Sequence, residues 1–162
     1  MNIDLIVVGK TDSAEVAAIV TDYSRRISRR ARFGVVALPD VKRTAKTLPT
    51  TIMKAEGDML LRQFSADDYV VLLDDKGVQY DSGQFASWLG ARLAGAGAAS
   101  GARRMVFVVG GAYGFSPEVR ARSNESVSLS RMTFSHQIVR AIFAEQLYRA
   151  FTILAGEPYH HE

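Results

Sequence analysis

The chain has 162 residues, of which 48% are hydrophobic, and its formal net charge is +3. This length suits one folded unit, so we expect residues 1–162 to form a single domain with a buried core. Because cysteine is absent and the three histidines lack the spacing of metal ligands, disulfides, thiolate catalysis and sulfur-built zinc sites are excluded, and we expect no metal site.

The N-terminus indicates a first strand rather than a targeting segment. The opening residues, MNIDLIVVGK, have no basic lead-in and no small-residue cleavage site, which distinguishes them from a signal peptide. No apolar run approaches the roughly 20 residues that a membrane-spanning helix needs. We therefore expect a cytoplasmic protein without membrane attachment.

The first half of the chain alternates apolar runs with helical patterns. Residues 3–8 form a predicted strand, and a capping-box-like start at Asp12 opens a helix with apolar residues at helical spacing. Residues 33–38 form a second predicted strand. After a polar, basic loop, the spacing of apolar residues predicts another helix over residues 53–64.

The middle of the chain continues this alternation. Residues 69–73, YVVLL, are continuously apolar, as is typical of a strand covered on both faces, and the strand is predicted to end at DDKG. Ser82 is the predicted N-cap of the next helix. The stretch LAGAGAASGA resembles a dinucleotide fingerprint only superficially, because it closes a helix and precedes a strand; we predict a flexible connection into the strand at 105–109.

The C-terminal part predicts a short helix, a strand and the longest helix. Ser116 and Pro117 favour a helix start, SVSLS favours a short strand, and the last helix is predicted from about residue 135 to 154, with a favourable Glu145–Arg149 pair. Strands and helices alternate throughout. The sequence therefore predicts an α/β fold with a mainly parallel sheet and helices on both faces.

Basic residues are concentrated toward the end of the first predicted helix. The segment RRISRRAR carries Arg25, Arg26, Arg29 and Arg30, which fall largely off the apolar face. Clustered arginine is the usual footprint of a polyanion partner, although a solvated helix face gives the same pattern. A second basic segment, VKRTAK, lies nearby and leaves the two interpretations about equally supported.

Three strand ends are suited to a ligand, because parallel α/β sheets bind ligands beyond the carboxyl ends of their strands. These ends are Leu73 with Asp74, Gly110 with Gly111, and residues 129–134. Paired glycines let a flat ligand approach the backbone, although for this pair taken alone a plain tight turn is the better explanation. Neither a P-loop nor a GxSxG elbow is present. The residues alone thus predict a loop-built site in an α/β domain.

Several long motifs resemble the signature of the RlmH-type SPOUT methyltransferases. They are IVVGK near the start, LLDDKG in the middle, and VVGGAYGFS, SLSRMTFSHQIVRAIFAEQLYRAF and GEPYH toward the end. The similarity extends over essentially the whole chain. It implies a SPOUT-type C-terminal trefoil knot, a rare exception to the usual rules of chain connection, with the cofactor bound in the knotted loops.

The resemblance also implies an activity and its partners. It implies methylation of N3 of a pseudouridine in 23S ribosomal RNA, dependent on S-adenosyl-L-methionine, with the large ribosomal subunit or the whole ribosome as partner. It further implies a homodimer in which residues of both subunits build the site. Two alternatives stay open: a non-catalytic dimeric RNA-binding module, and a related knotted methyltransferase that acts on tRNA.

The family motifs place site residues on the loops already singled out. The cofactor contacts implied are Leu73, Gly110, Gly111, Leu129, Ser130, Arg131, Met132, Thr133 and Phe134. The catalytic residues implied are His136, Arg140 and His160, and Tyr159 is implied to contact RNA. Ser135 stands where the family pattern TFPH has proline, and serine can cap the following helix.

The acceptor N3–H must lose a proton, so a general base is expected. His136 lies near the start of the last predicted helix, where the positive end of the helix dipole favours a neutral, proton-accepting imidazole. His160 is the alternative base, and His136 could equally serve only as a hydrogen-bond partner of the loop or the RNA. Arg140 could hold a phosphate or a uracil carbonyl, or make a structural ion pair.

Overall fold

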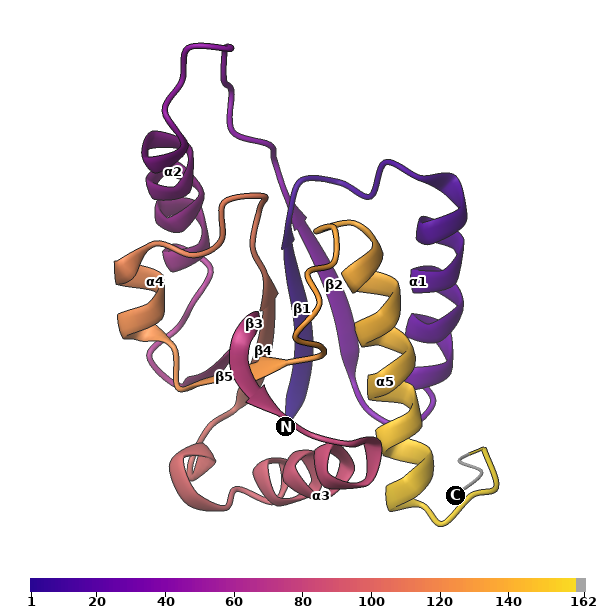
Figure 1. Cartoon of the computed structure of the whole chain (residues 1–162). Helices are drawn as coiled ribbons and strands as arrows, with labels where there is room; N and C mark the ends of the chain where they lie inside the picture. Colours follow the sequence, from indigo (N-terminus) through magenta and orange to yellow (C-terminus); the bar gives the residue numbers. More distant parts are fainter. Residues whose placement is uncertain (160–162) are drawn as a thin grey trace.

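One five-stranded parallel sheet organises the computed structural model, which describes residues 1–159 and, of residue 98, only the backbone (Figure 1). The strand order is β2-β1-β4-β3-β5, and every pair of neighbouring strands is parallel. The strands are β1 (Asn2–Val8), β2 (Phe33–Leu38), β3 (Asp68–Gln79), β4 (Arg104–Val109) and β5 (Glu125–Ser128). The predicted parallel sheet is confirmed, and its carboxyl ends all point to one edge.

Helices cover both faces of the sheet, as predicted. They are α1 (Ala14–Ile27), α2 (Pro49–Leu61), α3 (Ser82–Leu93), α4 (Pro117–Arg122) and α5 (Ile138–Leu154), with a short 3-10 turn η1 (Gly97–Ala99). Helices α1, α3 and α5 pack on one face, where Leu5 and Val7 of β1 join their core cluster. Ile6 and Val8 point to the other face, into the cluster shared with α2 and α4, because successive strand residues face opposite sides.

Two helix caps lie one residue away from their predicted positions. Ser13, and not Asp12, caps α1: its hydroxyl accepts the N–H of Val16 at 3.3 Å. Asp81, and not Ser82, caps α3, accepting the N–H of Gln84 at 2.7 Å while the Gln84 side chain accepts the Asp81 N–H. In both cases two neighbouring residues are good caps, so only the backbone turn decides which one is used.

Strand β3 is longer than predicted. Its register shifts between Leu73 and Val78, after which Val78 and Gln79 pair again with β5. The sequence DDKG therefore forms a bulge within the strand and not its end. The prediction missed this because Val78 and Gln79 pair with β5, which is far away in the chain. This bulge places Asp74 and its neighbours at the carboxyl edge of the sheet.

The last strand and the last helix are both shorter than predicted. Strand β5 ends at Ser128, and α5 begins at Ile138 rather than near residue 135. The hydroxyl of Ser135 accepts the N–H of Ile138 at 3.1 Å, so this serine does support the helix start as expected. The segment between β5 and α5 is consequently a loop of nine residues, 129–137, and most of the predicted site lies in it.

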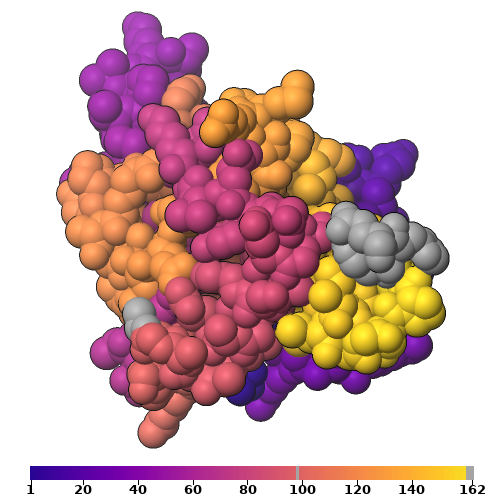
Figure 2. All heavy atoms as spheres, turned by 60° about the horizontal axis from the view of Figure 1, so that its bottom comes forward, coloured from indigo at the N-terminus to yellow at the C-terminus, as the bar shows by residue number. Residues whose placement is uncertain are grey.

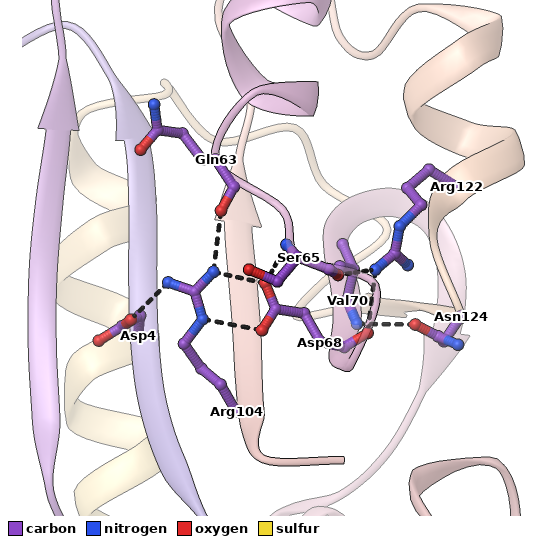
Figure 3. A network of polar contacts seen from close by, with 8 residues as sticks. All are labelled: Asp4, Gln63, Ser65, Asp68, Val70, Arg104, Arg122 and Asn124. Carbon is purple, nitrogen blue, oxygen red and sulfur yellow. Dashed lines mark hydrogen bonds and ion pairs between the residues drawn. The ribbon is translucent and has the colours of Figure 1, made fainter.

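The amino edge of the sheet is held together by ion pairs (Figure 3). Arg104 of β4 binds Asp4 of β1 at 3.0 Å and Asp68 of β3, and it also donates to the Gln63 carbonyl at 2.8 Å. Burial alone would raise the pKa of Asp68, but its hydrogen bonds, chiefly with Arg104, outweigh this effect and hold the pKa below its ordinary value. This edge is therefore tightly cross-linked, whereas the opposite edge is formed by loops.

The loops and helix ends give the molecule two distinct ends. In Figure 1 the connection between β2 and α2 rises well beyond the carboxyl edge, and the loops after β4 and β5 reach the same side. Figure 2 brings the amino edge forward and shows α3 with its following connection beside the end of α5. Across residues 1–159, the helices are all too short or too polar to traverse a lipid bilayer.

Candidate functional site

A cavity of about 390 Å³ opens at the carboxyl edge of the sheet. Its walls come from the bulge within β3, from the loops after β4 and β5, from Arg120 of α4 and from the first turn of α5. The residues predicted from the sequence that line it are Leu73, Gly110, Gly111, Leu129, Ser130, Met132, Thr133, Phe134 and His136. Three segments far apart in the chain thus meet at one place, which is where parallel sheets bind ligands.

The paired glycines are required by their neighbours. A Cβ on Gly111 would lie 2.4 Å from the carboxylate oxygens of Glu56, and one on Gly110 would lie 3.1 Å from the Phe115 ring. Glu56 is buried, and burial raises the pKa of its carboxyl group. A side chain at Gly111 could not be added without moving that carboxyl or the loop, so the cavity wall here is bare backbone.

Hydroxyl groups shape the loop between β5 and α5. The Ser128 hydroxyl donates to the Ser130 carbonyl at 2.9 Å, and the Ser130 hydroxyl accepts the N–H of Met132 at 2.9 Å. These bonds turn the chain so that Met132, which is 76% exposed, stands at the rim of the cavity. Arg131 is exposed and, unlike its neighbours, is not part of the lining.

One end of the cavity is polar, a feature that the sequence analysis missed. Arg120 of α4 pairs with Asp74 of β3 at 2.6 Å, and Asp74 also accepts the N–H of Lys76 at 3.0 Å. Burial would raise the pKa of Asp74, yet these hydrogen bonds outweigh it and the pKa lies below its ordinary value. Asp75 and Tyr113 complete this polar end. Asp74 and Asp75 lie in the motif DDKG and Tyr113 lies in GGAYGFS, so the sequence motifs already contained three of these polar residues.

His136 and Arg140 have different places. The half-buried His136 lines the cavity, whereas Arg140 is only 1% exposed and lies behind the lining. The Arg140 guanidinium donates to the carbonyls of Val8 at 2.8 Å, Gly9 at 2.9 Å and His136 at 2.9 Å. Its acceptors are thus carbonyls, with the Thr11 hydroxyl at 3.1 Å, and no carboxylate in residues 1–159 pairs with it.

Tyr159 lies away from the cavity. It donates its hydroxyl to Glu145 at 3.1 Å, shares a 3.1 Å contact with the Tyr23 hydroxyl, and packs edge-on against the Tyr148 ring. Burial raises the pKa of the Tyr159 hydroxyl. His160, the alternative base, falls outside the described residues, so its position relative to the cavity stays a prediction.

The four predicted RNA-binding arginines are not equivalent. Arg25 and Arg26 both pair with Asp22, at 2.7 and 2.8 Å, and Arg30 pairs with Glu157. A second hollow, of about 270 Å³, is lined by Arg26, Arg29, Arg30 and Tyr148, whereas Arg25 is not part of it. The structure therefore brings three of the four together, Arg26 in the last turn of α1 and Arg29 and Arg30 just after it, beside Tyr148 of α5 and far along that helix from His136.

The carboxyl-edge cavity suits a small, partly flat organic ligand. Its volume falls in the usual range for small-molecule sites, and its lining combines apolar side chains and bare backbone with the charged residues Asp74, Asp75, Lys76 and Arg120. Leu129, Phe134 and Val139 form apolar walls, and Gly111 leaves the backbone open. Within the described chain no three histidine, aspartate or glutamate side chains gather in a way that could hold a metal ion.

Comparison with known proteins places this geometry in context. A family model described as a predicted SPOUT methyltransferase matches residues 1–160. A relative from Porphyromonas gingivalis, named "Ribosomal RNA large subunit methyltransferase H", is 47% identical over 162 residues, covering 100% of both chains. Relatives of the same name from Christiangramia forsetii (44% over 161 residues, 99% of both chains) and Bacteroides fragilis (40% over 162 residues, 100% of both) are similar as well.

Proposed function

Because the chain belongs to the SPOUT methyltransferases, in their RlmH-type branch, we propose that it methylates the 23S ribosomal RNA of the large subunit. The observation that carries this proposal is the cavity at the carboxyl edge, whose walls are formed by the same three segments that contain the family motifs. The full-length relatives named as ribosomal RNA methyltransferases support the RNA substrate. The finer proposal is that the accepting atom is N3 of a pseudouridine on the large subunit or the whole ribosome.

We assign the cavity to S-adenosyl-L-methionine, whose sulfonium supplies an electrophilic methyl group when it is bound. The bare backbone at Gly110 and Gly111 and the apolar side chains of Leu73, Leu129 and Phe134 would hold an adenosine group. Ser130, Met132 and Thr133 belong to the same wall. Because the Arg131 side chain lies outside the lining, any contact from this residue would come from its backbone.

His136 is our candidate for the base that removes the N3 proton of the acceptor. Its side chain faces the cavity, and a positioned base contributes typically about 10²–10⁴-fold to the rate. Arg140, which binds the His136 carbonyl and the end of β1, would act as a positioning residue. His160 is the alternative base. The remaining acceleration would come from alignment of the acceptor with the methyl group.

A knot and a homodimer complete the proposal. We infer that the segment between β5 and α5 is part of a trefoil knot, as in the family. We also infer that two copies associate and that both contribute to the site. Sedimentation equilibrium of the purified chain tests the dimer directly.

The deciding experiment is mass mapping of 23S ribosomal RNA from a strain that lacks this protein. We expect one methylated pseudouridine to disappear and to return when ribosomes from that strain are incubated with purified protein and S-adenosyl-L-methionine. Unchanged ribosomal RNA together with a lost modification in tRNA would favour the tRNA enzyme. Calorimetry showing no binding of S-adenosylhomocysteine would favour the non-catalytic RNA-binding module.

A further inference from the structure

The hollow lined by Arg26, Arg29, Arg30 and Tyr148, here called the arginine–tyrosine hollow, is separate from the cofactor cavity. The two share helix α5: Val139 lines the cavity and Tyr148 lines the hollow. Nine residues of helix separate them, which corresponds to about 14 Å at the helical rise. The hollow also lies at the carboxyl-terminal end of α1, beside the amino edge of the sheet.

Two of its three guanidinium groups are already fixed in place. Arg26 donates its Nε–H to Asp22 at 2.8 Å and lies 5.8 Å from the centre of the Tyr148 ring. Arg30 donates to Glu157 at 2.7 Å and lies 5.6 Å from the same ring. Each is thus held between a carboxylate and an aromatic face, which reduces the side-chain entropy that a bound ligand would have to remove.

Arg29 differs from its two neighbours. Its side chain is exposed, and among residues 1–159 it has neither an ion pair nor a hydrogen bond from its guanidinium. Arg25, Arg26, Arg29 and Arg30 together face two carboxylates, Asp22 and Glu157, so the surface around the hollow keeps an excess of positive charge. A hollow with fixed guanidinium groups and surplus positive charge favours a compact anion with several acceptor oxygens.

We propose that the arginine–tyrosine hollow binds a backbone phosphate of the substrate RNA, outside the nucleotide that is methylated. The inference rests on the proposed function, which supplies an RNA partner. Arg29 gains its ionic partner on binding, while Arg26 and Arg30, aligned on Tyr148, present further donors to the same phosphate. Such a contact adds affinity and sets the register of the RNA without reading its sequence. It therefore predicts a defect in binding and none in the chemical step.

The test compares Arg29→Gln with a matched control on the opposite face of the sheet. Arg62→Gln removes the same charge from an exposed position at the end of α2. Binding of each variant to ribosomes from a strain lacking the protein is measured over a series of KCl concentrations. For Arg29→Gln we expect about tenfold weaker binding at low salt and a slope of log K against log[salt] reduced by about 0.7–0.9, the value for one phosphate.

Two further readouts separate this contact from other causes. Single-turnover methylation at saturating ribosome concentration and the affinity for S-adenosylhomocysteine should both match the unmodified protein. Arg29→Lys, which keeps the charge but not the planar fork, should recover the salt slope and only part of the affinity.

The proposal is overturned if Arg29→Gln and Arg62→Gln weaken ribosome binding equally, because the effect would then belong to overall charge. It is also overturned if Arg29→Gln leaves affinity and salt slope unchanged. Failure of the proposed function would look different: the unmodified protein would itself neither methylate the ribosomes nor bind S-adenosylhomocysteine.

Discussion

The carboxyl-edge cavity and the arginine–tyrosine hollow are built by opposite means. The cavity is formed by loops whose backbone is exposed at Gly110 and Gly111, and the charged pair at its polar end is internally neutralised. The hollow is formed by long cationic side chains stacked on one aromatic ring. A backbone wall recognises shape and tolerates little change, whereas a group of guanidinium ions recognises charge and tolerates more. The effects of substitutions in the two regions should therefore differ in magnitude and in the property that is lost.

The largest effect on cofactor binding is expected at Gly111. In Gly111→Val the new Cβ would lie 2.4 Å from the buried Glu56 carboxylate, so the carboxyl group or the loop must move, and the valine side chain replaces the bare backbone of the cofactor wall. We expect binding of S-adenosylhomocysteine to fall by at least about 100-fold, because the loss of a close backbone contact and the intrusion of a side chain act together. Isothermal titration calorimetry measures this, with circular dichroism to confirm folding.

A matched control is Gly83→Ala in α3, where the nearest atom to the new Cβ would be 3.5 Å away. This variant should bind the ligand normally. Normal binding by Gly111→Val would show that the backbone wall is not where the cofactor lies, and the contrast between the two regions would lose its basis.

His136 tests whether the cavity also contains the chemistry. We expect His136→Ala to lower the single-turnover methylation rate by about 10²–10⁴-fold, the usual contribution of a general base, and to change ribosome affinity little. His160→Ala is tested beside it. If methylation by both variants stayed near that of the unmodified protein, a histidine base would be wrong.

Arg140 is a buried arginine whose removal should affect stability more than RNA binding. Arg140→Met leaves the carbonyls of Val8, Gly9 and His136 without their donor, and we expect the free energy of unfolding to fall by roughly 2–4 kcal/mol. Urea denaturation measures this change. Arg140→Lys should restore part of the stability, since one ammonium group reaches fewer carbonyls than a guanidinium.

The kinetic readout for Arg140 separates positioning from packing. If Arg140 orients His136, the Arg140→Lys variant should show a lower kcat at an almost unchanged KM, measured at a temperature where it is fully folded. A variant that loses stability while keeping kcat would assign Arg140 a structural role alone.

Sequence reasoning located the cavity because it depends on a general property of parallel sheets. Leu73, Gly110 and residues 129–134 lie at or just beyond the carboxyl ends of three predicted strands, and the structure brings all of them except Arg131 to one lining. The polar end was missed because the partner of Asp74 is Arg120, on a helix 46 residues later, and nothing local predicts that pair.

The burial of Arg140 could not be predicted from sequence patterns either. Arg140 lies in α5, but two of its acceptors are backbone carbonyls at the end of β1, those of Val8 and Gly9, and backbone carbonyls have no residue signature. The predictions of the helix caps and of the end of β3 were wrong for related reasons. At the caps, two adjacent residues compete for the same role. At the end of β3, pairing with the distant strand β5 decides where the strand ends. The family resemblance, and not periodicity, supplied the ligand and the knot.

The smallest effect is expected at Tyr148, where the ring only supports its neighbours. Tyr148→Leu removes the aromatic face beneath Arg26 and Arg30, and a cation–π contact at an exposed site stabilises by about 0.5–1 kcal/mol. Ribosome binding should therefore weaken by about two- to fivefold, while Tyr148→Phe, which keeps the ring, should bind like the unmodified protein. A large loss in both variants would mean that the hydroxyl contacts the RNA directly, and the hollow would then recognise its ligand by specific geometry, as the cavity does.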